Sequence, residues 1–360
     1  MARIIFHLGP GKCGSSAIQT YLRRTSAAAD ACLHAILPRS KDIQALEAGD
    51  GGTIEGYAAR MARAAAPGLP LIISHEALFK KKAALLALVR AALDQGADAS
   101  ALAYVRRQSD YLRSVYGQWL FREPNRIAET ATILRGHDID PMLFTGVERH
   151  LMAIALGHHD VGRDAGGFTR FDWSDSMSAM AQELGALEVP LTVAALPSRD
   201  AERPLLVDFA TRIGLASDAA PTDDAVVNAA FDPAIVEAVS NAIERGFDMP
   251  GRHEANRFLA VGDATVQAIP LPDAAFLTWL GDCIDTRFEA RNLAFAKDFG
   301  IDPAYFKPRG IRNPEDLAER IRQETALRRA VPAAERLAHI QGRADAMQRA
   351  WQHFQAGRKA

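Results

Sequence analysis

The sequence predicts an α/β fold in which helices flank a doubly wound parallel sheet. Four short runs have the apolar character of strands, at residues 4–8, 71–74, 102–105 and 191–196. Segments with helical spacing separate these runs, and such alternation implies parallel strands joined by crossover helices. With 360 residues and 48% hydrophobic side chains, the chain can bury one large core or two moderate ones.

A glycine-rich loop follows the first strand and leads into a helix, where Ile18, Tyr21 and Leu22 share one face. Loop glycines let the backbone approach a ligand closely. The helix N-terminus offers unpaired N–H groups with a partial positive charge, and the loop adds one cation and two hydroxyl donors. We therefore predict an anion-binding loop. Its residues are Gly9, Gly11, Lys12, Cys13, Gly14, Ser15 and Ser16.

The loop departs from the Walker pattern of nucleotide kinases. That pattern needs a glycine where Phe6 stands in this chain. Cys13 occupies the position of the serine or threonine that would hold magnesium, and a thiol is a poor ligand for a hard cation. The loop therefore predicts binding of a phosphate-like group without a metal. The alternative is an ordinary glycine-rich turn that carries a surface lysine.

A second candidate anion site follows the strand at residues 102–105. Arg106 and Arg107 come directly after this strand, and a helix is predicted to begin near Ser109. Ser114 lies off the apolar stripe of that helix. An arginine matches phosphate oxygens with a fork of donors, and a helical serine adds a directed hydroxyl. The alternative is a solvated pair of arginines with an incidental serine.

Both segments carry a family resemblance. The run HLGPGKCGSSAIQTYL, residues 7–22, resembles the 5′-phosphosulfate loop of sulfotransferases, especially their bacterial carbohydrate-type branch. The run YVRRQSDYLRSVYGQ, residues 104–118, looks like the segment with which that branch holds the 3′-phosphate. The resemblance implies a P-loop-like fold and the sulfuryl donor 3′-phosphoadenosine 5′-phosphosulfate (PAPS), used without a metal.

The resemblance also implies roles for individual residues. Lys12 and the loop around it would bind the 5′-phosphosulfate, and Arg106 with Ser114 would bind the 3′-phosphate. The family usually has Lys-Thr-Gly followed by two small hydroxyl residues. Cys13 replaces the threonine here, which removes one side-chain donor to the phosphosulfate.

Polar residues at the carboxyl end of the strand at 71–74 supply candidates for a catalytic base. Sulfuryl transfer to an alcohol needs a base near the acceptor hydroxyl. Glu76 is the first choice, and His75 is the alternative because its unperturbed pKa suits proton transfer near neutrality. In an extended strand, Ser74 and Glu76 would share one face and His75 the other. Glu76 could instead be a structural carboxylate that pairs with an arginine of the predicted phosphate site.

Composition argues against several other classes of protein. A net charge of −2 disfavours general nucleic-acid affinity, and the lysines at 80–82 are expected to form a solvated helix start. Cys13, Cys32 and Cys283 are few and widely spaced, which fits a reducing compartment. No apolar run reaches the roughly 18 to 20 residues of a membrane span, and no leader pattern is present. A cytoplasmic protein is expected.

The sequence predicts one sulfotransferase-like domain over residues 1–310. Residues 123–170 interrupt its alternation of strands and helices and are expected to form a helical insertion that shapes the acceptor cleft. His150, His158 and His159 in this insertion match no zinc-ligand spacing, so no metal site is expected.

Residues 311–360 are predicted to form a helical appendage. Asn313 and Pro314 mark a helix start, and Pro332 separates a second helix. The apolar seam of that second helix predicts that the helix packs either on the chain's own domain or on a second copy of the chain, as a homodimer. Its apolar seam consists of Leu337, Ile340, Ala344, Met347, Trp351 and Phe354.

These observations lead to one hypothesis and two alternatives. The hypothesis is a PAPS-dependent sulfotransferase that moves a sulfuryl group to a hydroxyl of a glycan, glycolipid or other small acceptor by in-line displacement. Glu76, or alternatively His75, would take the acceptor's proton, and Lys12 would stabilise the departing phosphate. The alternatives are a P-loop-like nucleotide kinase or NTPase, and a non-catalytic relative that binds the nucleotide without turnover.

Overall fold

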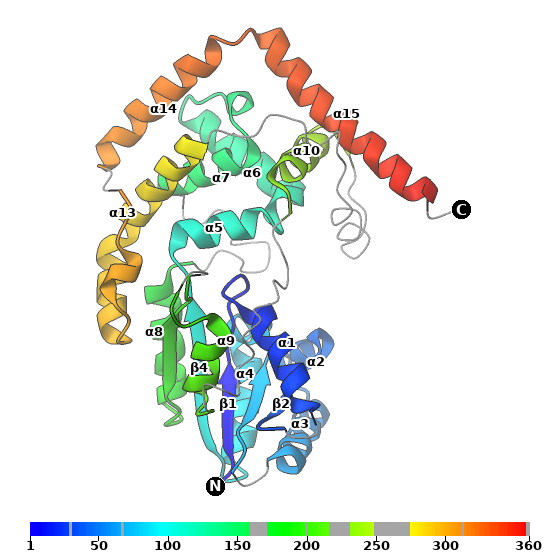
Figure 1. Cartoon of the computed structure of the whole chain (residues 1–360), viewed down its shortest axis with the longest axis vertical. Helices are drawn as coiled ribbons and strands as arrows, with labels where there is room; N and C mark the ends of the chain where they lie inside the picture. Colours follow the sequence, from blue (N-terminus) through cyan, green and yellow to red (C-terminus); the bar gives the residue numbers. More distant parts are fainter. Residues whose placement is uncertain are drawn as a thin grey trace. The chain divides into compact units, whose positions relative to one another are not determined.

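Figure 1 shows the computed structural model of the chain, and two compact units emerge from its contacts. The structure describes residues 1–28, 31–65, 68–158, 171–198, 201–215, 231–247, 274–310 and 313–357. Unit 1 comprises Met1–Arg106, Asp172–Ala229 and Arg291–Tyr305. Unit 2 comprises Arg107–Phe171, Ala230–Ala290 and Phe306–Ala360.

The described part of unit 1 contains a five-stranded sheet in which all neighbouring strands are parallel. The strand order is β2-β3-β1-β4-β5, so β1 lies at the centre. The strands are β1 (Arg3–His7), β2 (His34–Ile36), β3 (Leu71–Ser74), β4 (Asp98–Val105) and β5 (Leu191–Ala195). This confirms the predicted α/β class with a parallel sheet. β2 is not among the predicted strands, because three residues with one buried side chain are too short to show a strand pattern.

Helices lie on both faces of this sheet. They include α1 (Ser15–Ser26), α2 (Ser40–Glu47), α3 (Gly51–Ala64), α4 (Lys82–Leu93), α8 (Trp173–Gly185) and α9 (Leu205–Arg212). Right-handed crossovers place α1 on one face and the later crossover helices on the other, because the chain steps from β1 to β2 in one direction and then returns. Contacts agree with this: α1 packs beside α9, while α2, α3 and α4 pack on one another. Figure 1 shows α9 in front of the strands and α4 behind them.

The direction in which the chain moves across the sheet differs between the neighbouring strands β1 and β4. The chain leaves β1 toward β2 on one side and leaves β4 toward β5 on the other. Open parallel sheets bind ligands in the crevice at the carboxyl ends of two such strands. The glycine-rich loop follows β1, and Arg106 follows β4. Unit 1 therefore positions the loop and Arg106 at the same edge of the sheet.

The described part of unit 2 is built of helices. They are α5 (Gln108–Tyr116), η2 (Leu120–Arg122), α6 (Pro124–Gly136), η3 (Pro141–Leu143), α7 (Gly146–Ala155), α10 (Pro233–Glu244), α14 (Pro314–Arg329) and α15 (Ala333–Gly357). The helix α13 (Ala274–Asp298) contributes residues 274–290 to unit 2 and residues 291–298 to unit 1, and η5 (Pro303–Phe306) follows it.

A capping box starts α7. The Thr145 hydroxyl accepts from the N–H of Glu148, whose carboxylate accepts from the N–H of Thr145 at 2.7 Å. Arg328 of α14 also donates to this carboxylate, through two N–H···O bonds of 2.8 and 2.7 Å. Glu148 is fully buried, so the bidentate pair is needed to compensate its lost hydration.

The predicted insertion at residues 123–170 is described only to residue 158, where it forms α6, η3 and α7. His150 of α7 is buried and stacks on Tyr116 with ring centroids 5.4 Å apart. His159 lies outside the described residues. The role of this segment in shaping an acceptor cleft stays a prediction.

The predicted C-terminal helices correspond to α14 and α15. α15 packs on α10 within unit 2, and the seam residues Ala344, Met347 and Trp351 are buried. Leu337, at the start of the seam, is 50% exposed. A homodimer through these helices and a domain boundary at residue 310 stay predictions, since the contacts divide the chain elsewhere.

The described part of the chain bears on the predictions about membranes and metals. No helix in the described ranges is both long and apolar enough to cross a bilayer. Within the same ranges, no three His, Cys, Asp or Glu side chains gather in a way that could hold a metal ion. His137 and His158 do approach as a pair, with Nε2 atoms 2.9 Å apart.

Candidate functional site

The loop between β1 and α1 has a tight backbone. The N–H of Leu8 donates to the Leu102 carbonyl of β4 at 2.8 Å, and the N–H of Cys13 closes a turn onto the Pro10 carbonyl at 3.1 Å. Lys12, inside this turn, has a φ of 68°. A non-glycine residue in such a region costs on the order of 1–3 kcal/mol and persists where the surroundings impose it, often at functional sites. The loop therefore holds Lys12 in a strained, fixed position.

Two loop glycines lie where a side chain has no room. Gly14 has a φ of 84°, and a Cβ there would be 2.5 Å from Leu205 Cδ2. A Cβ at Gly9 would be 2.6 Å from the Ser15 Cβ and 3.0 Å from His7 Cε1. The loop backbone thus packs directly against side chains of the protein at both positions, so each position needs a glycine.

Lys12 is within electrostatic reach of both Arg106 and Glu76. Burial and the charge of Arg106 lower the pKa of Lys12 to about 8, while the charge of Glu76 opposes this shift. The three residues follow β1, β4 and β3, which are neighbours in the sheet. The structure therefore brings three predicted site residues together. A bound oxyanion would relieve the repulsion between Lys12 and Arg106.

Lys80 is a further cation of this site, and the sequence did not single it out. It ends η1 (Glu76–Phe79) and is half-buried, so burial lowers its pKa to about 8, opposed by the charge of Glu76. Lys81 is exposed, and Lys82 pairs with Glu183 at 2.9 Å. The expected solvated helix start is therefore wrong for Lys80. Its position four residues beyond Glu76 is the signal that could have found it.

His75 has a structural task at the end of β3. The strand ends at Ser74 and η1 begins at Glu76, so the strand alternation expected to place these two on one face stops before Glu76. His75 caps η1, with its Nδ1 accepting from the N–H of Ala77 at 3.0 Å. A neutral imidazole that accepts at Nδ1 carries its proton on Nε2. Burial also lowers the pKa of His75.

His7 and Ser74 form a buried pair beside the loop that no sequence motif reveals. They face each other across β1 and β3, with His7 Nδ1 and Ser74 Oγ 2.7 Å apart. Burial lowers the pKa of His7 to about 3, so the imidazole is neutral. Its Nε2 is buried, has no hydrogen-bond partner within the described ranges, and would be 3.4 Å from a Cβ at Gly9. The loop therefore lies directly on the His7 ring.

The thiol and hydroxyl groups of the loop differ in exposure. Cys13 is fully buried, and burial raises the pKa of its thiol to about 12. Ser15 is also buried, whereas Ser16 is half-buried. Gly14 provides no side-chain cap for α1, an arrangement suited to an anion at the helix N-terminus. Cys13 and Ser15 thus pack inside the loop, and Ser16 is the more accessible hydroxyl.

The adjacent arginines have different environments. Arg106 ends unit 1, where its carbonyl accepts from Trp173 Nε1 at 2.6 Å. Arg107 begins unit 2, donates to the Lys307 carbonyl at 2.7 Å and lies 3.8 Å from an Asp285 oxygen. Arg107 therefore has a structural role, which leaves Arg106 as the arginine of the candidate site.

Asp285 anchors the start of α5 within unit 2. It accepts from the N–H of Ser109 at 3.0 Å and from its hydroxyl at 2.7 Å. Burial raises the pKa of Asp285 to about 6, although the bonds from Ser109 oppose this shift. Ser114 is half-buried on the same helix. Since Ser114 and Arg106 belong to different units, their joint role at a 3′-phosphate stays a prediction.

The chain matches no protein-family model, no curated protein and no solved structure. Its function is therefore inferred from the chemistry of the residues gathered in unit 1. Those residues are Lys12, Glu76, Lys80 and Arg106.

Proposed function

We propose that the carboxyl edge of the unit 1 sheet binds PAPS, and that the protein transfers its sulfuryl group to an acceptor hydroxyl. One observation carries this proposal: Lys12, held in a strained loop, lies within electrostatic reach of Arg106 and Glu76. The charge of Glu76 offsets part of the repulsion between the two cations, and a bound anion would offset more of it. A nucleotide with anionic groups at its 3′ and 5′ positions is such an anion.

The loop binds the 5′-phosphosulfate in this proposal. Gly9 and Gly14 let the loop pack closely against its neighbours, and the N-terminus of α1 supplies N–H groups with a partial positive charge. Lys12 adds a full charge, and Ser16 adds a hydroxyl. Arg106 binds the 3′-phosphate through its guanidinium fork.

The bound donor supplies a sulfuryl group attached to a phosphate that departs readily. Glu76 accepts the proton of the acceptor hydroxyl while the hydroxyl oxygen forms the new S–O bond. Lys12 stabilises the charge that grows on the 5′-phosphate oxygen as the old S–O bond breaks. The products are a sulfate ester and 3′-phosphoadenosine 5′-phosphate (PAP), and Glu76 then releases the proton to water.

Glu76 is a better base than His75 in this geometry. The lone pair of His75 Nδ1 is occupied by the N–H of Ala77, and Nε2 carries the proton of the neutral ring. His75 could accept a proton only by giving up its cap on η1. A carboxylate at Glu76 needs no such rearrangement, so the proton is assigned to it.

A nucleotide kinase or NTPase is the main rival, and a non-catalytic PAP-binding relative is the second. Walker-type enzymes hold magnesium through a hydroxyl directly after the loop lysine. Cys13 occupies that position, and its thiol is buried, with a pKa raised to about 12. The donor set thus favours a nucleotide bound without magnesium.

Calorimetric titration of the full chain distinguishes these possibilities. We expect PAP to bind without added metal, and ATP with magnesium to bind at least about tenfold more weakly, a difference near 1.4 kcal/mol. Lys12→Ala should weaken PAP binding, whereas Lys81→Ala, at an exposed lysine, should leave it unchanged. Tighter binding of ATP with magnesium would favour a kinase. PAP binding with no release of PAP from PAPS would favour the non-catalytic relative.

A further inference from the structure

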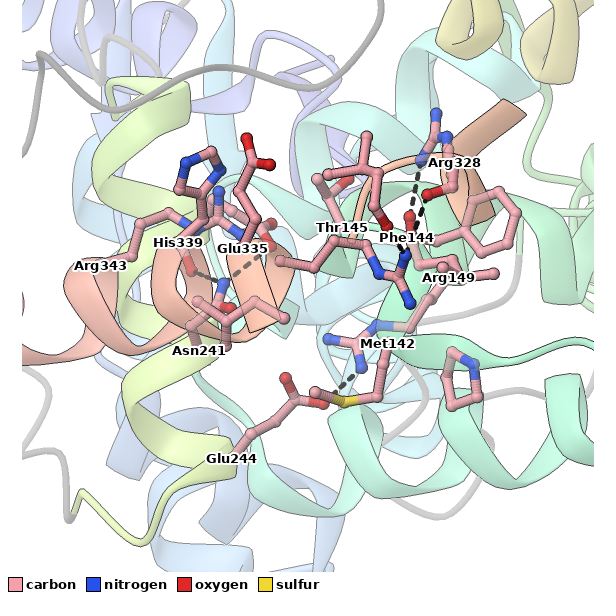
Figure 2. A pocket seen from close by; sticks show the side chains of 16 residues that line it. Met142, Phe144, Thr145, Arg149, Asn241, Glu244, Arg328, Glu335, His339 and Arg343 are labelled. Carbon is pink, nitrogen blue, oxygen red and sulfur yellow. Dashed lines mark hydrogen bonds and ion pairs between the residues drawn. The ribbon is translucent and has the colours of Figure 1, made fainter. Parts of the chain in front are cut away.

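Unit 2 contains a cavity of about 400 Å³, within the size range of small-ligand pockets. It is bounded by η3 and the start of α7, by α10, by the end of α14 and by the first turns of α15. Figure 2 shows His339 and Arg343 of α15 on one side, with Met142 and Phe144 on the other. All its lining residues belong to unit 2, and none belongs to the proposed PAPS site.

Two arginines of the lining are committed to the fold. Arg328 binds Glu148 through two N–H···O bonds and lies over the Phe144 ring, 4.6 Å from its centroid. Arg336 donates to the Arg328 carbonyl at 3.1 Å and to the Val331 carbonyl. Arg336 thereby caps the end of α14. These two guanidiniums build the wall of the cavity.

The other two arginines have donors without acceptors. Arg149 is only 2% exposed and pairs with Glu244, as Figure 2 shows, but its Nε has no partner among the residues described. Arg343 is half-buried on α15, and its Nε is likewise buried without a partner. Buried N–H groups are normally satisfied, so two orphans in the lining of one cavity call for an acceptor.

The acidic side chain at the floor is already occupied. Glu237 is buried and accepts from the N–H of Gly146 at 3.0 Å and from Asn241 Nδ2 at 2.8 Å. Its two oxygens therefore have partners, and the donors of Arg149 and Arg343 remain in excess. A ligand that brings oxygen acceptors would complete the hydrogen bonding of the cavity.

Charge and shape narrow the class of ligand. Glu244 pairs with Arg149, Glu148 pairs with Arg328, and the exposed Glu335 also lines the cavity. Glu237 is a further lining carboxylate; burial raises its pKa, and the charges of Arg149 and Arg343 oppose this shift. The lining therefore has little net positive charge for a polyanion. A single negative charge is better matched. Much of the remaining wall is apolar and would contact a hydrophobic body; it includes Pro141, Leu143, Phe144, Val331 and Ile340.

We propose that this cavity binds a small monocarboxylate with an apolar body, and that Arg343 and Arg149 donate to the carboxylate. The apolar wall excludes water from the other end of the ligand. Because the cavity shares no residue with the loop of unit 1, this inference is independent of the proposed sulfuryl transfer.

Benzoate is a suitable probe, and benzyl alcohol is its neutral counterpart of similar size. Saturation-transfer NMR on the full chain should show benzoate binding at least about tenfold tighter than benzyl alcohol, as expected for charge-assisted hydrogen bonds. No transfer to benzoate at millimolar concentration, or equal affinity for both probes, would overturn the proposal.

Variants locate the binding. Arg343→Gln should weaken benzoate binding about tenfold, since it removes the charge and the guanidinium donors. Arg349→Gln, at an exposed arginine of the same helix, and Lys12→Ala, in unit 1, should bind benzoate like the wild type. Wild-type affinity in Arg343→Gln, or loss of binding in Lys12→Ala, would contradict the assignment.

A second variant blocks the cavity by volume instead of charge. Met142 lines the cavity and is 41% exposed, so Met142→Trp can be tolerated by the fold while it fills the space. Benzoate binding should be lost in a protein whose thermal unfolding matches the wild type. Retained binding in that folded variant would place benzoate elsewhere and reject the proposal, even if Arg343→Gln fails to fold.

Discussion

The loop site of unit 1 and the cavity of unit 2 both present cations to a ligand, but they are built differently. The loop site depends on backbone: a strained Lys12, two glycines with no room for a side chain, and the carboxyl ends of three parallel strands. The cavity depends on side chains from several helices, held by ion pairs such as Arg328–Glu148. The loop site should therefore lose ligand affinity when a loop glycine gains a Cβ. The cavity should lose affinity when a guanidinium of its lining is removed.

Among substitutions in the loop site, removal of the proposed base Glu76 is expected to have the largest effect on turnover. Glu76→Gln should lower the rate of PAP release from PAPS, with water as acceptor, by about 10²- to 10⁴-fold, the usual contribution of general base catalysis. PAP affinity and the midpoint of thermal unfolding should stay near wild type. A structural carboxylate would instead lower the thermal midpoint.

His75→Asn is the matched control for that prediction, because asparagine can still cap a helical turn. Its PAP release should stay within a few-fold of wild type. A loss equal to that of Glu76→Gln would make His75 part of the proton transfer.

Lys12→Ala should cost about 3 kcal/mol of transition-state stabilisation, comparable with the loss of one oxyanion donor. The rate of PAP release would then fall by about 10²-fold. Lys81→Ala, at an exposed lysine of the same unit, should react at the wild-type rate. Near-wild-type turnover in Lys12→Ala would remove this lysine from the mechanism.

Gly14→Ala tests the dependence on backbone. Gly14 and Gly96 both have positive φ, 84° and 69°, but a Cβ at Gly96 would meet nothing within 4 Å. Gly96→Ala should therefore lower the free energy of unfolding by about 1–2 kcal/mol, the conformational cost alone. Gly14→Ala should cost more, because its Cβ would overlap Leu205, and it should also weaken PAP binding. Equal losses in urea unfolding would show that the close packing of the loop contributes nothing.

A smaller effect is expected in the dependence of PAP affinity on pH. The pKa of Lys12 is lowered to about 8, so PAP affinity should fall as pH rises through that value, by at most about tenfold per pH unit for one proton. For folding the sign is opposite: between pH 8 and 10.5 the unfolded state binds more protons at Lys12, so its contribution to stability improves as pH rises.

Calorimetry across this pH range checks the prediction. Lys12→Ala should reduce the dependence of PAP affinity on pH more than Lys80→Met does, because Lys12 is the lysine of the loop. The second variant is needed because the pKa of Lys80 is also lowered to about 8. A flat profile in the wild type would contradict the role of the Lys12 charge in binding.

The sheet and the loop could be predicted because their signals are local. Strand β3 has the same bounds, residues 71–74, in the prediction and in the structure, since four consecutive buried residues leave a clear apolar run. The loop is a short motif whose glycines and lysine are adjacent in sequence. β2 could not be predicted, because its three residues are too few to show a strand pattern and only the pairing with β3 identifies it as a strand.

The rest depends on contacts between distant residues. Arg106 and Arg107 are adjacent and chemically identical, yet Arg107 is committed to a carbonyl 200 positions further along the chain. The orphan nitrogen of His7 is visible only when β1 and β3 are paired. Arg149 and Arg343 both line the cavity of unit 2, but they are too far apart in the sequence for any local pattern to relate them. Composition and spacing carry no signal for such pairings.

The most direct measurement compares the affinities of PAP and adenosine 5′-phosphate for the wild type, Lys12→Ala and Arg106→Ala. If Lys12 and Arg106 hold the two ends of one nucleotide, the wild type should prefer PAP. Arg106→Ala should then bind both ligands equally, and Lys12→Ala should bind both more weakly while keeping the preference. A wild type without preference for the 3′-phosphate, or a preference that survives in Arg106→Ala, would contradict this arrangement.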